Sequence, residues 1–152
     1  MRAIESQIKA FDKAIAEQMA LIPNTLTSVN GIGPVYSAGI IAEIGDISRF
    51  PNQASLAKYA GLVWSQHQSG DFEAQNTRMI QSGNRYLKYY LCEAALSLVR
   101  CDAEYRSFYH RKYKEVNKYQ HKRALALTAR KFVRLVFRLL KDNCLYRAPE
   151  SK

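Results

Sequence analysis

The chain has 152 residues, enough for one domain with a sizeable hydrophobic core. Its 47% hydrophobic and 24% charged residues exclude disordered, low-complexity and collagen-like proteins. No apolar run has the length of a membrane-spanning helix, and the first twelve residues are too charged for a signal peptide, so we expect a cytoplasmic protein without a membrane partner.

The charge of the chain is strongly positive and unevenly distributed. Lys and Arg number 23 against 13 Asp and Glu, a formal net charge of +10. Residues 1–76 carry a net charge of −2, whereas residues 77–152 carry +12. This excess of positive charge predicts a polyanionic partner such as nucleic acid, bound through the second half of the chain.

The cysteines and histidines do not form a recognisable metal or disulfide pattern. The three cysteines are odd in number and lack C-x-x-C spacing, and the three histidines are scattered. We therefore predict neither a disulfide framework nor a metal site in this chain.

The first predicted element is an amphipathic helix within residues 1–21. Ile4, Ile8, Phe11 and Ile15 recur at spacings of three and four, with charged residues between them. The apolar seam covers about two heptads and is coiled-coil-like. It either packs on its own domain or joins a second copy of the chain, which would give a homo-oligomer.

The second feature is a glycine turn between two predicted helices within residues 25–44. Pro34 suits the first turn of the second helix, and the glycines permit the tight turn before it, so the pattern predicts a helix-hairpin-helix. Such a turn directs backbone N–H groups at a phosphate, which makes Gly31, Ile32 and Gly33 candidate nucleic-acid contacts. The alternative is a purely structural turn.

A short helix and an irregular segment come next. Asn52 is predicted to cap a helix over residues 53–60, which Gly61 closes. Residues 62–72 lack helical periodicity, so we predict an extended, irregular or β-like segment.

Two further helices are predicted from residue 84 to residue 116. The first has Arg85 and Lys88 near its start, Ser82 as the predicted cap, and an apolar stripe of Leu87, Leu91, Ala94, Ala95 and Leu98. The second, over residues 103–116, alternates aromatic and basic residues. This alternation suits nucleic acid, but we favour the alternative, in which the rings are core residues beside a solvated charged face.

The last predicted helix, over residues 121–141, has two opposed faces. Five apolar residues fall within an arc of about 80°: Leu125, Ala129, Phe132, Val136 and Leu139. Five basic residues lie on the opposite side: Arg123, Arg130, Arg134, Arg138 and Lys141. A cationic face of this length predicts nucleic-acid binding that weakens steeply with salt.

Several motifs together resemble one protein family. They are Gly31-Ile-Gly-Pro34, Glu43-Ile-Gly-Asp-Ile-Ser-Arg-Phe-Pro51, Tyr59-Ala-Gly-Leu62, Gln68-Ser-Gly70, Ser82-Gly-Asn-Arg-Tyr-Leu87 and His121-Lys-Arg-Ala124. Their order and spacing resemble those of the C-terminal transposase domain of the insertion-sequence one-ten family. The members of that family are bridge-RNA-guided DNA recombinases. On this basis we divide the chain into a coiled-coil-like helix (1–21), a transposase domain (22–146) and a tail (147–152).

The resemblance implies a function for one serine. In this family a serine of the C-terminal domain attacks a DNA phosphodiester, and Ser69 matches that position. The resemblance also implies DNA and a structured guide RNA as partners, a dimer or tetramer of the full-length protein, and Mg²⁺ held by a RuvC-like domain that precedes this one. We therefore expect no cofactor in this chain and no DNA cleavage by it alone.

The chemistry of such a serine needs assistance from neighbouring groups. A hydroxyl is a weak nucleophile without a base or metal, and the phosphoryl transition state needs cations around its oxygens. Arg78 and Arg85 are candidate clamps for the phosphate, His67 is a candidate base, and Ser65 and Ser82 are competing hydroxyls. Two other functions remain open: a nucleic-acid-binding module without catalysis, and a tyrosine recombinase that uses one of the ten tyrosines.

Overall fold

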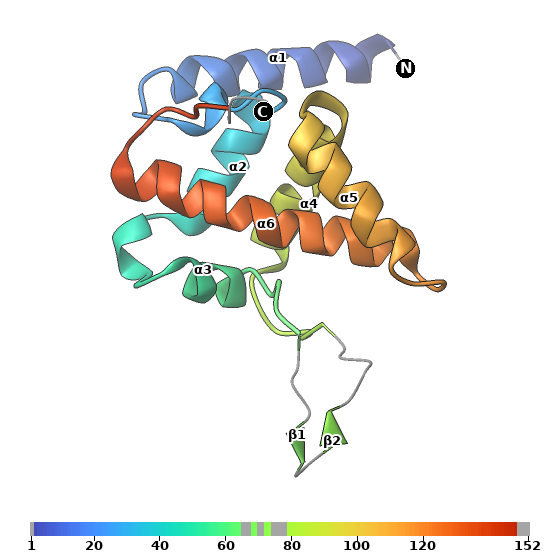
Figure 1. The fold of residues 1–152 in the computed structure, drawn as a ribbon. Coiled ribbons are helices and arrows are strands. Elements are labelled where there is room, and N and C mark those ends of the chain that lie inside the picture. Colours follow the sequence, from blue (N-terminus) through green and yellow to red (C-terminus); the bar gives the residue numbers. More distant parts are fainter. Residues whose placement is uncertain (1, 65–67, 70–71, 74–78, 149–152) are drawn as a thin grey trace.

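The computed structural model describes residues 2–64, 68–69, 72–73 and 79–148, which fold mainly into α-helices as predicted (Figure 1). The α-helices are α1 (Arg2–Met19), α2 (Pro34–Ile44), α3 (Gln53–Tyr59), α4 (Arg85–Cys101), α5 (Ala103–Lys114) and α6 (Gln120–Asp142). The 3-10 helices are η1 (Leu26–Ser28) and η2 (Ile47–Arg49), and the strands are β1 (Gln68–Ser69) and β2 (Phe72–Glu73).

The core is built where α6 crosses α3, α4 and α5 (Figure 1). The predicted stripe of α4 is confirmed, because all five of its residues are fully buried. Phe132 of α6 is also fully buried and meets Tyr105 of α5 edge-on, with ring centroids 6.4 Å apart. Burial of a side chain of this size stabilises the fold by about 1.5–3 kcal/mol.

The buried face of α6 is wider than the predicted arc of about 80°. At 100° per residue its buried positions span about 200°, and they are Ala124, Ala126, Thr128, Ala129, Phe132, Val133, Val136 and Leu139. The reason is that α6 packs against helices on several sides, and small residues on its flanks allow those helices to come close.

The contact between α2 and α4 depends on a glycine. A β-carbon built on Gly39 of α2 would lie 2.5 Å from ring atoms of Tyr90 of α4. The absence of a side chain at Gly39 therefore makes room for the Tyr90 ring and brings the two helices together.

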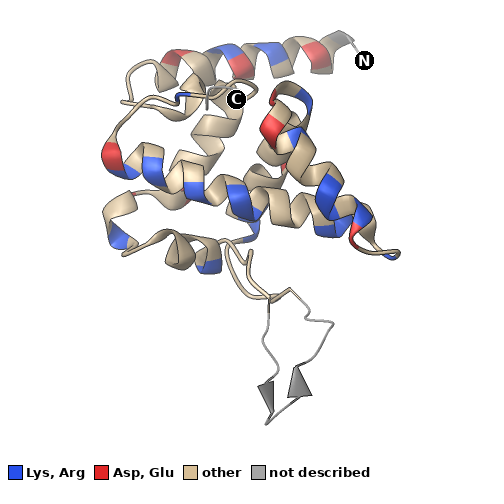
Figure 2. Ribbon diagram, in the orientation of Figure 1, with Lys and Arg blue, Asp and Glu red and all other residues tan. Residues whose placement is uncertain are grey.

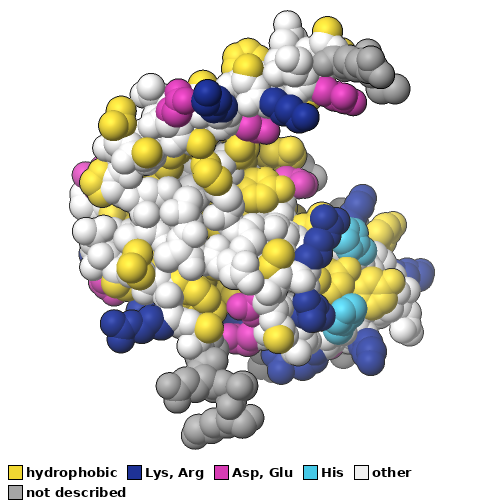
Figure 3. All heavy atoms as spheres, turned by 90° about the horizontal axis from the view of Figure 1, so that it is seen from above, with side chains coloured by type: hydrophobic (Ala, Val, Ile, Leu, Met, Phe, Trp, Pro, Cys, Tyr) yellow, Lys and Arg dark blue, Asp and Glu magenta, His cyan; other side chains and the backbone are white. Residues whose placement is uncertain are grey.

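Helix α1 is the amphipathic helix that the sequence predicts, but most of its apolar seam does not pack on the domain. Ile4, Ile8 and Phe11 are 63%, 53% and 69% exposed, whereas Met19 at the end of the helix is buried. Figure 3 shows the N-terminal part of α1 standing clear of the rest of the molecule. The exposed seam is therefore available to a second molecule.

The chain after α6 returns across the molecule and ties distant elements together. Asn143 ends α6 in the left-handed conformation. The backbone N–H of Tyr146 then donates to Ser28 Oγ (2.8 Å), and its hydroxyl donates to Asp102 Oδ2 (3.4 Å). These contacts link the C-terminal segment to η1 and to the cap of α5.

None of the described helices combines the length and apolar character needed to cross a bilayer.

Candidate nucleic-acid interface

The two ends of the segment that contains Ser69 meet immediately before α4. Trp64 and Met79 form an antiparallel bridge, and the N–H of Ile80 donates to Val63 O (2.9 Å). Within the segment, β1 and β2 pair antiparallel, with Ser69 opposite Phe72. The predicted β-like character of this segment is thus confirmed for these residues.

Two glycines close the root of this segment. Gly61 and Gly83 both have positive φ angles, of 69° and 126°. A β-carbon on Gly83 would lie 2.6 Å from the backbone nitrogen of Gly61, a distance that no side chain can occupy. The backbones of the outgoing and returning chain are therefore in direct contact.

Asn84 joins this root to three helices. Its Oδ1 accepts hydrogen bonds from the N–H groups of Tyr86 (2.9 Å) and Leu87 (3.0 Å), which caps α4. Its Nδ2 donates to Glu43 Oε2 of α2 (2.7 Å) and to Tyr59 Oη of α3 (3.2 Å). The residues of three separate sequence motifs thus form one polar network.

The prediction that Ser82 caps α4 is wrong. Ser82 lies two residues before the cap position and is exposed. Gly83, with its positive φ, turns the chain so that Asn84 takes the extended conformation of an N-cap residue.

A cation–π cluster of one arginine and two aromatic rings supports the same root from the side of η2. The Arg49 guanidinium carbon lies 5.0 Å from the ring centroids of both Phe50 and Tyr59, and the two rings are 5.3 Å apart. Asp46 caps η2 by accepting from Ser48, and these hydrogen bonds hold the pKa of its carboxyl below the ordinary value. The motif over residues 43–51 therefore positions Tyr59 and, through it, Asn84.

The predicted catalytic residues are only partly described. Ser69 lies in β1. Arg78, His67 and Ser65 lie outside the described residues, so their places relative to Ser69 remain predictions. Arg85 begins α4, where its guanidinium carbon lies 4.8 Å from the ring centroid of Tyr86 and its Nη2 donates to Tyr86 Oη (2.7 Å).

The glycine turn before α2 differs from the predicted helix-hairpin-helix. Its first helix is the three-residue 3-10 helix η1, and the N–H of Ile32 donates to Val29 O (2.9 Å) instead of being free. The Ile32 side chain is in the core, and Gly31 O accepts from Ser97 Oγ of α4 (2.7 Å). Around the position of a β-carbon on Gly33, by contrast, the space is open. Contacts within the protein thus engage Gly31 and Ile32, two of the three turn residues that were predicted to contact nucleic acid.

The five basic residues of the predicted cationic face of α6 divide into two groups. Arg123 pairs with Glu115 (3.0 Å), and Arg130 donates to Leu62 O (2.9 Å) while burial and the neighbouring Arg134 lower its pKa. Arg134, Arg138 and Lys141 are exposed and form what we call the free basic face of α6 (Figure 2). The cationic face available to a partner is therefore shorter than predicted.

The aromatic residues of α5 support the structural interpretation of that helix. Tyr105 is buried, and the Lys131 ammonium lies 4.9 Å from the ring centroids of both Tyr105 and Phe108 while pairing with Glu104. In the second half of the helix, Tyr109 Oη meets His121 Nδ1 at 2.7 Å. Figure 3 shows the histidines there beside basic and apolar side chains. Spacing alone did not reveal this α5–α6 contact.

Metal ligands do not gather in the described part of the chain. No three His, Cys, Asp or Glu side chains among the described residues come close enough to share an ion. The cysteines Cys92, Cys101 and Cys144 are all free thiols.

Comparison with known proteins identifies the family. The chain is 32% identical over 145 residues to the insertion element IS110 43.6 kDa protein of Streptomyces coelicolor and 29% identical over 146 residues to the insertion element IS116 44.8 kDa protein of Streptomyces clavuligerus. A probable family 20 transposase of Pseudomonas aeruginosa is 31% identical over 100 residues. These matches cover 95%, 95% and 66% of this chain, but the chain spans only 34%, 36% and 28% of those proteins. Residues 24–110 match the profile of the transposase IS116/IS110/IS902 family, and the chain belongs to that family, as its motifs predict.

Proposed function

We propose that this chain is the DNA-binding and catalytic-serine domain of an insertion-sequence transposase. Family membership supports the role in transposition. The net charge of +10 and the free basic face of α6 support binding to a polyanion. In this proposal residues 22–146 form the transposase domain, residues 1–21 join copies of the protein, and residues 147–152 are a tail.

The DNA backbone is bound by cations without reading the bases. Arg134, Arg138 and Lys141 lie on one side of α6, close to 180° from its buried face, and present charge to successive phosphates. Arg85 and Lys88 add positive charge at the start of α4. Gly33 is the residue of the glycine turn that is open to a phosphate. Arg123 and Arg130 position α6 through their contacts with Glu115 and Leu62.

Ser69 is the proposed nucleophile. Its Oγ attacks the phosphorus of a DNA phosphodiester, so a new O–P bond forms while the bond from phosphorus to the leaving sugar oxygen breaks. A base takes the serine proton and passes a proton on to that sugar oxygen. Arg78 and Arg85 stabilise the charge on the phosphate oxygens. The support for this role is the match of Gln68-Ser-Gly70 to the family, together with the rigid root that holds the ends of this segment.

Other components come from outside the chain. We place Mg²⁺ in a RuvC-like domain that precedes this one in the full-length protein, and we add a structured guide RNA and a second copy of the protein as partners. The assembly works in the cytoplasm, where it reaches chromosomal DNA. The isolated domain then binds DNA without cutting it.

The test is a serine substitution in a full-length relative. Replacing the serine that aligns with Ser69 by alanine removes the attacking hydroxyl, so covalent protein–DNA adducts and strand exchange are expected to disappear while DNA binding persists. Retained strand exchange would contradict the catalytic role and leave a binding module. Adducts mapped to a tyrosine would instead indicate a tyrosine recombinase.

A further inference from the structure

The first turns of α4 expose two tyrosines that the core does not use. Tyr86 and Tyr89 are 54% and 59% exposed. They are three residues apart, so they lie on the same face of the helix, opposite the buried Leu87 and Leu91. Large rings held in solvent on one face, beside basic residues, are typical of surfaces that stack on a ligand.

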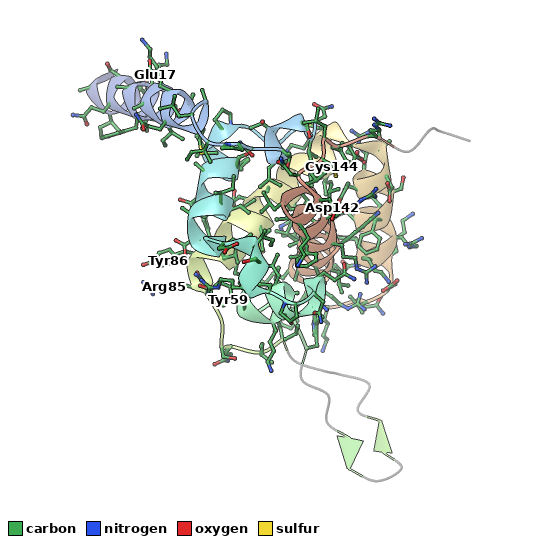
Figure 4. All side chains as sticks on the ribbon, turned by 90° about the vertical axis from the view of Figure 1, so that its left-hand side faces the viewer. Glu17, Tyr59, Arg85, Tyr86, Asp142 and Cys144 are labelled. Carbon is green, nitrogen blue, oxygen red and sulfur yellow. The ribbon has the colours of Figure 1, made fainter. Side chains whose placement is uncertain are left out.

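Each exposed ring is supported by a neighbour. The Arg85 guanidinium lies over the Tyr86 ring and donates a hydrogen bond to its hydroxyl. Tyr89 meets Tyr90 edge-on, with centroids 5.4 Å apart, and Tyr90 is itself fixed against Gly39. Figure 4 shows Arg85 and Tyr86 at the outer edge of the molecule, on the same side as Tyr59. The rings therefore lose little conformational freedom when a ligand binds.

The charges around these tyrosines favour an anionic ligand. Arg85 and Lys88 lie in the same turns of α4. Glu43 of α2 accepts a hydrogen bond from Asn84, and Glu93 lies one turn further along α4 from Tyr89. The first two turns of α4 thus combine stacking surfaces with phosphate-binding cations.

We propose that Tyr86 and Tyr89 stack on unpaired bases of a single DNA strand whose phosphates Arg85 and Lys88 contact. Bases within a duplex are already stacked on both faces and leave no surface for these rings, whereas an unpaired base has a free face. The strand is DNA because α4 begins at the root of the segment that contains Ser69, and in this respect the inference rests on the proposed function.

Binding by the 152-residue chain tests this inference. Fluorescence anisotropy compares labelled oligonucleotides of about 12 nucleotides, within the usual footprint of stacking proteins, as single-stranded DNA, duplex DNA and single-stranded RNA of one sequence. The double substitution Tyr86→Ala and Tyr89→Ala is expected to weaken single-stranded DNA binding about tenfold or more, because stacking is lost. Duplex binding and the salt dependence for single strands are expected to stay unchanged, because no phosphate contact is removed.

Matched variants separate stacking from other effects. Tyr86→Phe with Tyr89→Phe keeps both rings and is expected to retain wild-type affinity. Tyr119→Asn removes a ring that is 80% exposed elsewhere, at a left-handed position that asparagine tolerates, and is expected to have no effect. Circular dichroism verifies that each variant is folded.

Three outcomes would overturn the inference: equal losses on duplex and single-stranded DNA, unchanged affinity in the double alanine variant, or tighter binding of RNA than of DNA. If the alanine pair has no effect while Arg134→Gln with Arg138→Gln still weakens DNA binding, the stacking inference fails and the proposed DNA-binding function stands. If no form of DNA binds, the proposed function fails with it.

Discussion

Ser37 lies within α2 with its hydroxyl fully buried, and no described residue gives that Oγ a hydrogen-bond partner. A buried polar group without a partner is destabilising. Ser37→Ala is therefore expected to raise the free energy of unfolding by about 1 kcal/mol, measured by urea denaturation. The matched control is Ser97→Ala, which removes the donor to Gly31 O and is expected to lower stability. Destabilisation by Ser37→Ala would show that its hydroxyl has a partner.

Asn84 is the residue on which the root of the Ser69 segment depends. Asn84→Ala removes the cap of α4 and leaves Glu43 and Tyr59 without their shared donor. We expect a loss of about 1–2 kcal/mol in the free energy of unfolding, the usual effect of losing a cap. Asn84→Asp keeps an oxygen for the cap but places a second carboxylate beside Glu43. The stability of this variant should therefore lie between that of the wild type and that of Asn84→Ala. An unchanged free energy of unfolding in Asn84→Ala would contradict the role of this network.

At the scale of elements, the free basic face of α6 and its engaged arginines should behave differently. Arg134→Gln with Arg138→Gln removes two exposed charges, so the slope of log affinity against log salt for duplex DNA is expected to fall by about 1.8. Arg123→Gln with Arg130→Gln removes residues held by Glu115 and Leu62 and should mainly lower stability. Anisotropy titrations over a range of salt, with urea denaturation, distinguish the two pairs. Equal slopes of log affinity against log salt for the two double variants would contradict the division of the α6 arginines into free and engaged residues.

The exposed seam of α1 predicts self-association. Ile8→Gln with Phe11→Gln makes the seam polar without touching the core, because both side chains are more than half exposed. Sedimentation is expected to show a dimer or larger species for the wild type and a monomer for this variant. The free energy of unfolding of the globular part should be the same in both proteins. A wild-type monomer at high concentration would exclude α1 as an oligomer contact.

The elements that the sequence predicts well are those with strong apolar periodicity. The stripe of α4 and the cap at Asn52 follow directly from spacing and side-chain chemistry, and both are confirmed. The cap of α4 was misassigned because Ser82 and Asn84 are both good caps, and only the positive φ of Gly83 selects between them. The width of the buried face of α6 depends on how many helices surround it, which periodicity within one helix does not contain.

The whole molecule should lose stability in alkali. Burial, followed by the nearby Tyr146 and Glu104, raises the pKa of Tyr105 above its ordinary value of 10.0, and burial with Asp102 raises that of Tyr146. In the unfolded chain these phenols ionise at lower pH than in the folded protein, so the free energy of unfolding falls as the pH rises above 10.0. Tyr105→Phe should remove up to about 1.4 kcal/mol per pH unit of this decline.

Thermal unfolding at pH values from about 9 to 11 measures this effect, because the interval begins below the ordinary phenol pKa and ends above it. Tyr119→Phe, which removes an exposed hydroxyl, is the matched control for the substitution itself. An identical alkaline decline in the wild type and in Tyr105→Phe would show that the buried phenol does not contribute.

For the molecule as a whole, motif order predicts the family and apolar periodicity predicts the helical class, and both are confirmed. The site was predictable only in outline. Arg123 and Arg130 look the same in the sequence as Arg134 and Arg138, but tertiary contacts with Glu115 and Leu62 divide them. Ile32 likewise looked available in its turn, and core packing makes it structural.

The start of α1 and the C-terminal segment lie on one side of the molecule, and α3 with the strands β1 and β2 lies on the other side (Figure 1). This arrangement has a practical consequence for experiments. A fluorophore or an affinity tag attached at the start of α1 lies on the side away from α3, beside which α4 begins, so it should report on ligand binding at the exposed tyrosines of α4 without blocking it.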